Sequence, residues 1–270
     1  MCGMRRGVNV PRQYLYLVGL AETITTEYEL VVWAGAIRGR CNNEKMCGRV
    51  TLRESTAKKL ADYFGIIFEE HFTARYNIAP TQRICAVRVS DAGKRELAAL
   101  HWGIVPSWNP KPIINVRCET VDTKATFKDA FKKRRCLLPV DGFYEWQNIG
   151  RKRQPYHIRM KDDNLFALGG LWQPRNAMAG EEIDSCAILT TDANEIVRPL
   201  HDRMPVIIGQ AAFANWLDHS QPLVAIKVLM RPYPAKAMVS IPVSSWVNTA
   251  AHEGEQCLAP PEPAERTLFE

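Results

Sequence analysis

The chain has 270 residues, of which 46% are hydrophobic and 24% charged, as in an ordinary globular protein and unlike a disordered one. Its formal net charge of +6 is mildly basic, which favours the approach of a polyanion without identifying one. Every apolar run is shorter than the roughly 18 residues that a membrane-spanning helix needs, so we predict no transmembrane segment and no membrane partner.

In chain order, residues 1–46 show no clear periodicity, whereas short β-like runs alternate with brief helices after them. The run "STAKKLADYFG" at 55–65 predicts a helix, because Ser55 can cap its start and Gly65 can end it. We predict strands at 83–90, 96–105, 135–146, 155–160, 165–172, 186–191 and 204–208. We predict further short helices at 126–135 and 209–218. The pattern favours an α+β fold with a curved, mostly antiparallel β-sheet and short flanking helices.

The eight cysteines form no C-x-x-C pair and do not alternate with histidine at ligand spacing, which argues against a structural zinc site. Several of them, such as Cys85 and Cys186, lie in apolar strand-like runs, where a reduced cysteine behaves as a small buried hydrophobic residue. We therefore expect a reducing, cytoplasmic compartment. The run "YLYLVGLA" at 14–21 loosely resembles a signal peptide, but Glu22 follows it directly and no clear cleavage site is present.

The internal segment "NEKMCGRVTL" places Met46 and Cys47 in a context that looks like the start of a protein. Without Met46, Cys47 would carry a free α-amine and a thiol on adjacent carbons, a 1,2-aminothiol. An aldehyde reacts with such a group to form an imine, which the thiol closes into a five-membered thiazolidine ring. The α-amine has a reference pKa of roughly 7.7–8.0, so part of it is neutral near pH 7. On residue type alone, however, a buried hydrophobic role for Cys47 carries the greater weight.

Eight ordered motifs begin at Met46 and continue through the rest of the chain. They read "MCGRV", "ARYNIAPTQ", "HWGIVPSW", "INVRCETV", "RCLLPVDGFYEW", "GLW", "ILTTDANEIVRPLHDRMPVII" and "PVSSWVN". In content and order they resemble the SOS-response-associated peptidase family, the abasic-site processing proteins that crosslink covalently to single-stranded DNA. The resemblance covers about residues 46–260 and implies a single domain with a partly barrel-like sheet.

The resemblance also implies the catalytic residues. The family's catalytic cysteine follows the initiator methionine, and Cys47 matches it rather than Cys2, since "MCGMRR" lacks the sequence that follows. Asn115 is then expected to hold the amine and the opened sugar, Glu145 to shuttle protons, and His201 to assist opening of the sugar ring. No metal or organic cofactor is implied, because the aminothiol supplies the reactivity.

Three further residues are implied in binding DNA. Arg49 and Arg117 would each offer a planar fork of donors to phosphate oxygens, which position a strand without reading its sequence. Trp108 stands where the family places an aromatic or apolar group against the bases. The basic run "KKRR" at 132–135 is either a phosphate track or the solvated end of a helix, and the second interpretation is favoured.

Each of these residues has a simpler interpretation when it is considered alone. Asn115 would be a turn or sheet-edge residue, Glu145 the outward-facing position of a strand, and His201 a hydrogen-bonded loop histidine. Only the ordered set of motifs argues for a shared site. Core packing is expected for Trp102, Trp146 and Trp172.

Residues 1–46 depart from the family pattern, because they would leave Cys47 with an amide nitrogen that cannot form an imine. Three explanations stay open: translation starts at Met46, the chain cleaves itself before Cys47, or the mature form does not crosslink. The lack of a helix or strand pattern upstream favours the first, and self-cleavage would use the Cys47 thiol as nucleophile. We expect residues 1–46 to be an extension, 47–260 the domain and 261–270 a loose tail.

The expected function is a monomeric sensor and shield of abasic sites in single-stranded DNA that forms a thiazolidine crosslink, with a weak lyase activity through the imine. Two rivals remain. A thiol peptidase that acts on other proteins would tolerate an amide-bonded Cys47. A non-covalent reader of single-stranded DNA would rely on Arg49, Arg117 and Trp108 alone, and its affinity would fall as the salt concentration rises.

Overall fold

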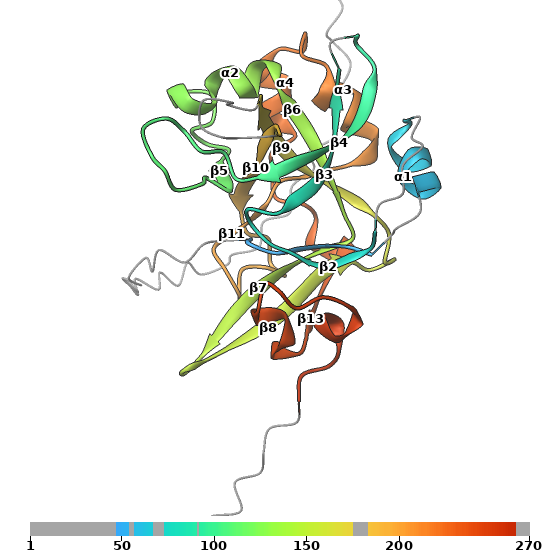
Figure 1. The fold of residues 1–270 in the computed structure, drawn as a ribbon, viewed down its shortest axis with the longest axis vertical. Helices are drawn as coiled ribbons and strands as arrows, with labels where there is room; N and C mark the ends of the chain where they lie inside the picture. The colour runs from blue at the N-terminus through green and yellow to red at the C-terminus, as the bar shows by residue number, and fades with distance from the viewer. Residues whose placement is uncertain (1–46, 54–56, 67–72, 91, 175–182, 263–270) are drawn as a thin grey trace, which may run out of the picture. The chain divides into compact units, whose positions relative to one another are not determined.

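The computed structural model describes residues 47–53, 57–66, 73–90, 92–174 and 183–262 (Figure 1). All of them belong to one compact unit, Glu44–Glu270. The predicted extension, the cap at Ser55 and most of the predicted tail lie outside the described residues, and the predicted domain boundaries stay predictions. No helix of the described part is long and apolar enough to cross a membrane.

Strands outnumber helices in the described residues. The strands are β1 (Val50–Leu52), β2 (Arg75–Ile78), β3 (Arg83–Val89), β4 (Arg95–Trp102), β5 (Asn115–Arg117), β6 (Arg135–Val140), β7 (Gly142–Ile149), β8 (Lys152–Met160), β9 (Phe166–Gln173), β10 (Ser185–Asp192), β11 (Arg203–Pro205), β12 (Ile207–Ile208) and β13 (Met238–Pro242). The α-helices are α1 (Ala57–Phe64), α2 (Ala125–Lys133), α3 (Phe213–Leu217) and α4 (Leu223–Val228). The 3-10 helices are η2 (Gln210–Ala212), η3 (Ala235–Ala237), η4 (Ser245–Asn248) and η5 (Glu255–Leu258).

The larger sheet closes on itself. Its strand order is β11-β10-β4-β3-β6-β9-β12, and β10 also pairs with β9 and with β5. Because β10 reaches both β4 and β9, the strands β10, β4, β3, β6 and β9 form a closed ring. The pairings of β10 with β4 and β5 are parallel, and the other pairings of the described strands are antiparallel. The predicted curved, mostly antiparallel and partly barrel-like sheet is confirmed.

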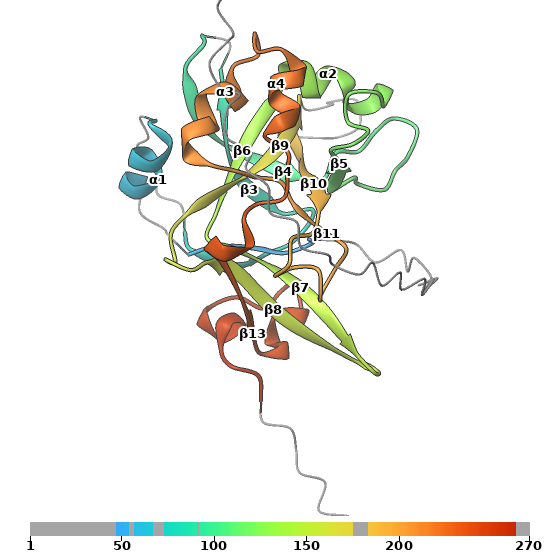
Figure 2. The same ribbon diagram turned by 180° about the vertical axis from the view of Figure 1, so that it is seen from behind.

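The smaller sheet has the order β13-β8-β7-β1-β2 and carries the start of the predicted domain. Its strand β1 lies between β7 and β2, with Val50 opposite Phe143 of β7 and Ile78 of β2. The β7–β8 hairpin extends beyond the rest of this sheet to a free tip, as both side views show (Figures 1 and 2). The segment that begins at Cys47 is therefore fixed against the base of this hairpin.

The single strand predicted at 135–146 is two strands that belong to different sheets. The chain leaves β6 in the ring and enters β7 in the smaller sheet at Asp141, whose backbone N–H donates to the carbonyl of Thr51. The predicted strand at 204–208 is similarly divided into β11 and β12 at Val206. The backbone N–H of Val206 donates to the carbonyl of Leu189, and its carbonyl accepts a hydrogen bond from the N–H of Gly169. Both divisions depend on partners that are distant in sequence.

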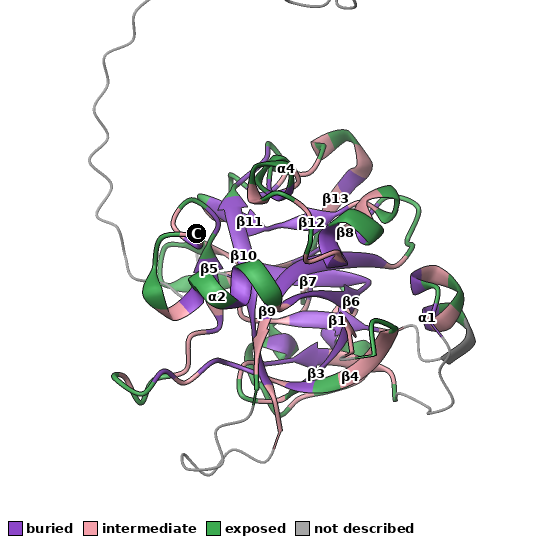
Figure 3. Ribbon diagram, turned by 90° about the horizontal axis from the view of Figure 1, so that it is seen from above, coloured by how far each residue is buried: buried purple, intermediate pink, exposed green. Residues whose placement is uncertain are grey.

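Burial follows the ring. All residues of β6 are buried, as expected for a strand covered on both faces. Purple strands lie together at the centre of Figure 3, whereas β4 of the ring is mostly pink. Arg135 begins β6 fully buried and donates to the carbonyls of Trp216, Phe131, Lys132 and Asp218. Burial lowers its pKa to about 10. Arg135 therefore holds helix ends together inside the protein, and only the lysines of the "KKRR" run, at the end of α2, are fully exposed.

Candidate functional site

The register of β1 against β7 brings Cys47 to Glu145. Cys47 lies just before β1, and the N–H of Tyr144 donates to the carbonyl of Arg49 at 3.0 Å, which continues the pairing outward from Val50. The backbone N–H of Cys47 then donates to Oε1 of Glu145 at 2.7 Å. Both residues are buried. A carboxyl group thus contacts the nitrogen that would carry the reaction.

Burial sets the protonation of this pair. It raises the pKa of Glu145 to about 8, although the hydrogen bond from Cys47 and the charge of Arg153 lower it. Burial, and next the charge of Glu145, raise the pKa of the Cys47 thiol well above its ordinary value. Near neutral pH the thiol is therefore protonated, and the carboxyl group is able both to give and to accept a proton.

Asn115 joins this pair from the larger sheet. It begins β5, where it lies opposite Ile188 of β10 in parallel pairing. Its Nδ2 donates to the carbonyl of Cys47 at 3.5 Å, a long hydrogen bond. Cys47 is thus contacted on its N–H by β7 and on its carbonyl by β5, so two strands from different sheets fix its backbone.

His201 lies on the loop between β10 and β11. The backbone N–H of Arg203 donates to its Nδ1 at 3.0 Å, and Oδ1 of Asp202 lies 2.8 Å from the same nitrogen. Among the described residues, no hydrogen bond or ion pair joins His201 to Cys47 or Glu145. The loop is nevertheless close enough to act on the site, because the charge of Asp202 raises the pKa of Glu145.

The loop of His201 and the segment of Asn115 are tied by an ion pair that sequence reasoning missed. Arg203 donates two hydrogen bonds to Glu119, at 2.6 and 2.8 Å, and a third to Asp192 at 2.7 Å. The signal was present in the sequence, since "INVRCET" and "HDRMP" each contain one partner. This pair holds two predicted site segments in a fixed relation.

Of the residues predicted to bind DNA, Arg49 already has partners inside the protein. Its guanidinium donates to Asn77 at 2.6 Å and to the carbonyls of Val247 and Asn248. It also lies 5.9 Å from the ring centroid of Trp146. Arg49 thus anchors the C-terminal "PVSSWVN" segment against the site, whatever further contacts it makes.

Arg117 and Trp108 lie on the surface. Arg117 ends β5 two residues after Asn115 and is exposed. Trp108 is 68% exposed, with its indole N–H donating to the hydroxyl of Thr126 at 3.3 Å. Of the tryptophans expected in the core, Trp102 is fully buried, whereas Trp146 and Trp172 are partly exposed. Trp146 and Trp172 nevertheless pack against buried hydrophobic residues, Trp172 on the main core and Trp146 on a smaller cluster around Tyr144.

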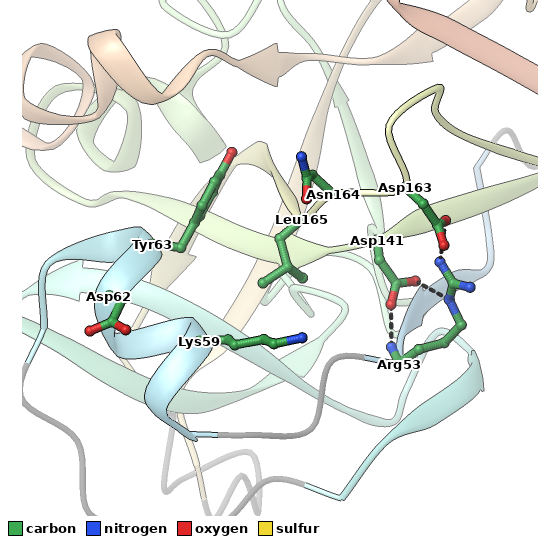
Figure 4. Close-up of a pocket in the computed structure, with 8 residues that line it drawn as sticks. All are labelled: Arg53, Lys59, Asp62, Tyr63, Asp141, Asp163, Asn164 and Leu165. Carbon is green, nitrogen blue, oxygen red and sulfur yellow. Dashed lines mark hydrogen bonds and ion pairs between the residues drawn. The ribbon is translucent and has the colours of Figure 1, made fainter.

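A pocket of about 590 Å³ lies elsewhere, between α1 and the loop that follows β8 (Figure 4). Its lining residues are Arg53, Lys59, Asp62, Tyr63, Asp141, Asp163, Asn164 and Leu165. Two of its acids, Asp141 and Asp163, pair with Arg53, as the dashed lines of Figure 4 show. None of the predicted site residues lines this pocket, so it is separate from the Cys47 site.

The described residues contain no group of three or more His, Cys, Asp or Glu side chains that could hold a metal ion. Within them, the groups at the site that could take part in a reaction are the thiol of Cys47, its nitrogen once that nitrogen is a free amine, and the carboxyl group of Glu145. This set suits chemistry at an electrophilic carbon, with proton transfer by a carboxyl group.

Comparison with known proteins gives the family of this chain. The model of the SOS response associated peptidase family matches residues 46–250. The chain belongs to this family. The abasic site processing protein YoqW of Bacillus subtilis is 34% identical over 224 residues, covering 79% of this chain and 99% of that protein.

More distant members of the family show the same relation. The abasic site processing protein HMCES of Xenopus tropicalis is 32% identical over 202 residues, covering 63% of this chain and 59% of its own length. A solved phage-related protein from Bordetella bronchiseptica has a TM-score of 0.64 and 26% identity, covering 74% of this chain and 95% of its own. The alignment covers nearly all of YoqW and leaves about a fifth of this chain unmatched, so the family fold does not require 270 residues.

Proposed function

We propose that this protein recognises abasic sites in single-stranded DNA and bonds to them covalently through Cys47. Relatives named abasic site processing proteins support the substrate. The observation that carries the chemistry is the 2.7 Å hydrogen bond from the Cys47 nitrogen to the buried Glu145 carboxyl group. This contact places an acid–base group on the atom that must lose protons when an imine forms.

The reaction needs a free α-amine on Cys47. The neutral amine adds to the aldehyde carbon of the opened abasic sugar, and Glu145 carries two protons in turn from the nitrogen to the former aldehyde oxygen. The first makes that oxygen a hydroxyl, and the second releases it as water and leaves the imine. The S–H bond then adds across the resulting C=N bond, sulfur to carbon and proton to nitrogen. The product is a thiazolidine that leaves the DNA strand unbroken and masks the aldehyde carbon.

Asn115 and His201 would support these steps. Asn115 contacts the carbonyl of Cys47 and would orient the amine toward the sugar. His201, on the loop with Asp202, would move a proton at the sugar ring oxygen and so assist opening to the aldehyde. The imine also acidifies the adjacent sugar carbon, so a weak lyase activity accompanies slow ring closure.

Self-cleavage before Cys47 is a second candidate activity, and the backbone favours it. Cys47 has a φ of +38°, in the left-handed region that costs a residue with a side chain roughly 1–2 kcal/mol. Breaking the preceding peptide bond removes this constraint, because an N-terminal residue has no φ torsion. The thiol would add to the Met46 carbonyl, its proton would pass through Glu145 to the departing nitrogen, and water would hydrolyse the thioester.

The rival peptidase that acts on other proteins is disfavoured. Such an enzyme uses a thiolate activated by an imidazole, and no histidine of the described residues hydrogen-bonds to the Cys47 thiol. Burial and the charge of Glu145 raise the pKa of this thiol, which opposes a thiolate. The same neutral thiol suits addition of S–H across an imine.

The test is intact mass together with a denaturing gel after incubation with single-stranded abasic DNA. Chains begun at Met1 and at Met46 are compared, since YoqW has no counterpart to about a fifth of this chain. We expect a heat-stable adduct only from molecules whose mass begins at Cys47. Cys47→Ala should abolish it, whereas Cys47→Ser should yield an adduct only after borohydride reduction, because its imine cannot close through sulfur.

Two results would overturn the proposal. Crosslinking by a chain whose mass begins at Met1 would show that another residue reacts. Equal DNA affinity of parent and Cys47→Ala, with no adduct from either, would favour the non-covalent reader.

A further inference from the structure

The distal half of the β7–β8 hairpin is strongly basic. Residues 147–154 read "QNIGRKRQ" and contain three cations and no acid. Arg151 and Lys152 are exposed at the tip, where Gly150 adopts a φ of +59° that allows the tight turn. The tip stands free of the other elements in both side views (Figures 1 and 2). The charges of Arg151 and Lys152 are therefore exposed at the tip.

The hairpin leads directly away from the site. Ile149, the last residue of β7, lies four positions after Glu145, which is about 13 Å along a strand. A stacked strand with the B-form spacing of about 3.4 Å would cover this distance in about four nucleotides, and an extended single strand would cover it in fewer. A DNA backbone that passes Cys47 and follows the hairpin would reach the tip within a few nucleotides.

Positive charge continues from the site to the tip. The guanidinium groups of Arg49 and Arg153 lie 5.9 and 5.7 Å from the ring centroid of Trp146. The charge of Arg153 also lowers the pKa of Glu145, so the positive charge of the hairpin influences the Cys47 site. Arg49, Trp146 and Arg153 thus connect the reacting residues to the hairpin.

The strand register presents cations on both faces of the tip. Lys152 pairs with Ile149, on the face that alternation shares with Glu145, and Arg153 pairs with Asn148, on the face of Trp146. Arg151 lies in the turn between the two strands. A DNA backbone that follows either face of the hairpin would therefore meet a cation at the tip.

We propose that Arg151 and Lys152 bind phosphates of the DNA that flanks the abasic nucleotide on one side. This inference rests on the proposed function and adds a second contact, several nucleotides from the lesion, to the same site. Because the contact is made to phosphates, it extends the footprint without adding sequence preference. Hairpin turns also carry charges merely for solubility, and the experiment distinguishes that role.

The experiment measures affinity of the full chain for single-stranded DNA that contains tetrahydrofuran, an abasic analogue without an aldehyde. The variant R151Q/K152Q is compared with K132Q/K133Q, which removes the same charge from the exposed end of α2. Two lost phosphate contacts should weaken binding on the order of 20-fold at 0.1 M salt and reduce the salt slope by about 1.4. The control should leave both quantities near those of the parent.

Shortened oligonucleotides locate the contact. Removing the flank on one side of the analogue should weaken DNA binding by the parent as much as the R151Q/K152Q substitution does. The same shortening should not weaken DNA binding by R151Q/K152Q further. Equal affinities for R151Q/K152Q and the control would overturn the inference, as would equal sensitivity to both flanks. Crosslinking of aldehyde DNA by the parent is scored separately, so a parent that binds through the tip but never crosslinks refutes only the covalent proposal.

Discussion

Two buried carboxyl groups, Asp141 and Glu145, lie four residues apart at the start of β7, and their surroundings differ. Each residue is 3% exposed. Asp141 accepts hydrogen bonds from the hydroxyl of Thr51, at 2.5 Å, and from the backbone N–H of Arg53, and it forms an ion pair with the Arg53 side chain. Both of its oxygens therefore have partners within the protein.

Glu145 has fewer polar partners than Asp141 among the described residues. Its hydrogen bond within the described residues comes from the Cys47 nitrogen, and burial raises its pKa to about 8. A fully partnered buried carboxylate holds the chain in place, whereas a sparsely partnered one keeps a proton that it is able to exchange near neutral pH. The comparison favours a structural role for Asp141 and supports the proposed chemical role of Glu145.

Asp141→Asn should give the largest effect. The amide cannot pair with the Arg53 cation, and breaking a buried ion pair costs about 3–5 kcal/mol. We expect urea unfolding at pH 7 to show a loss of this size. Asp163→Asn is the matched control, because Asp163 pairs with the same guanidinium from a half-exposed position and should cost under about 1 kcal/mol. Equal losses would show that the partners of Asp141 add no special stability.

Glu145→Gln should increase the stability of the folded protein, and only at higher pH. The folded protein raises the pKa of Glu145 from 4.5 to about 8, so between these values the folded state holds a proton that the unfolded state has lost. Parental stability therefore falls as pH rises through this window. The glutamine variant lacks this loss, for which the pKa window sets an upper limit of about 4.8 kcal/mol. Because water entry and relaxation around the ionised group reduce it, we expect the variant to be more stable by about 2–3 kcal/mol at pH 9 and equal at pH 4.

Urea unfolding of the full chain at several pH values tests this difference in stability. The full chain is used because its Cys47 nitrogen is an uncharged amide, which does not titrate beside Glu145 as a free α-amine would. A variant that is less stable than the parent at pH 9 would contradict the raised pKa. The same substitution should abolish crosslinking by the chain that begins at Cys47, which separates the chemical role from stability.

Much of the ring was predictable from the sequence, because strands such as β6 and β10 are continuous apolar runs buried on both faces. The division of 135–146 at Asp141 was not, since the partners of Asp141 lie about 90 positions earlier. Strands β1 and β2 are too short for periodicity to reveal them. The pairing of β1 with β7, however, is what brings Cys47 to Glu145.

The site was predictable only in part. Ordered motifs named Cys47, Asn115 and Glu145 together, and the structure joins these three through hydrogen bonds. Composition and spacing alone could not reveal that Arg135 is buried or that Arg203 ties Glu119 to its loop. Those facts depend on which sheets meet, and no local pattern records that.

Asp202→Asn should give the smallest effect and show what sets the pKa of Glu145. The carboxylate of Asp202 raises this pKa, but its side chain is 77% exposed, so water and salt weaken its field. We expect the substitution to lower the pKa of Glu145 by less than about one unit, because burial is the larger cause. Carbon NMR of the Glu145 carboxyl group through a pH titration measures the shift directly.

Arg153→Gln is the matched opposite, because the charge of Arg153 lowers the same pKa and its removal should raise it. Both shifts should shrink in 1 M salt, where the screening length falls to about 3 Å, while the elevated pKa persists. A return of the parental pKa toward 4.5 in high salt would mean that surface charges, and not burial, make Glu145 basic. In that case the contrast with Asp141 would lie in the charges around each group rather than in the number of hydrogen-bond partners.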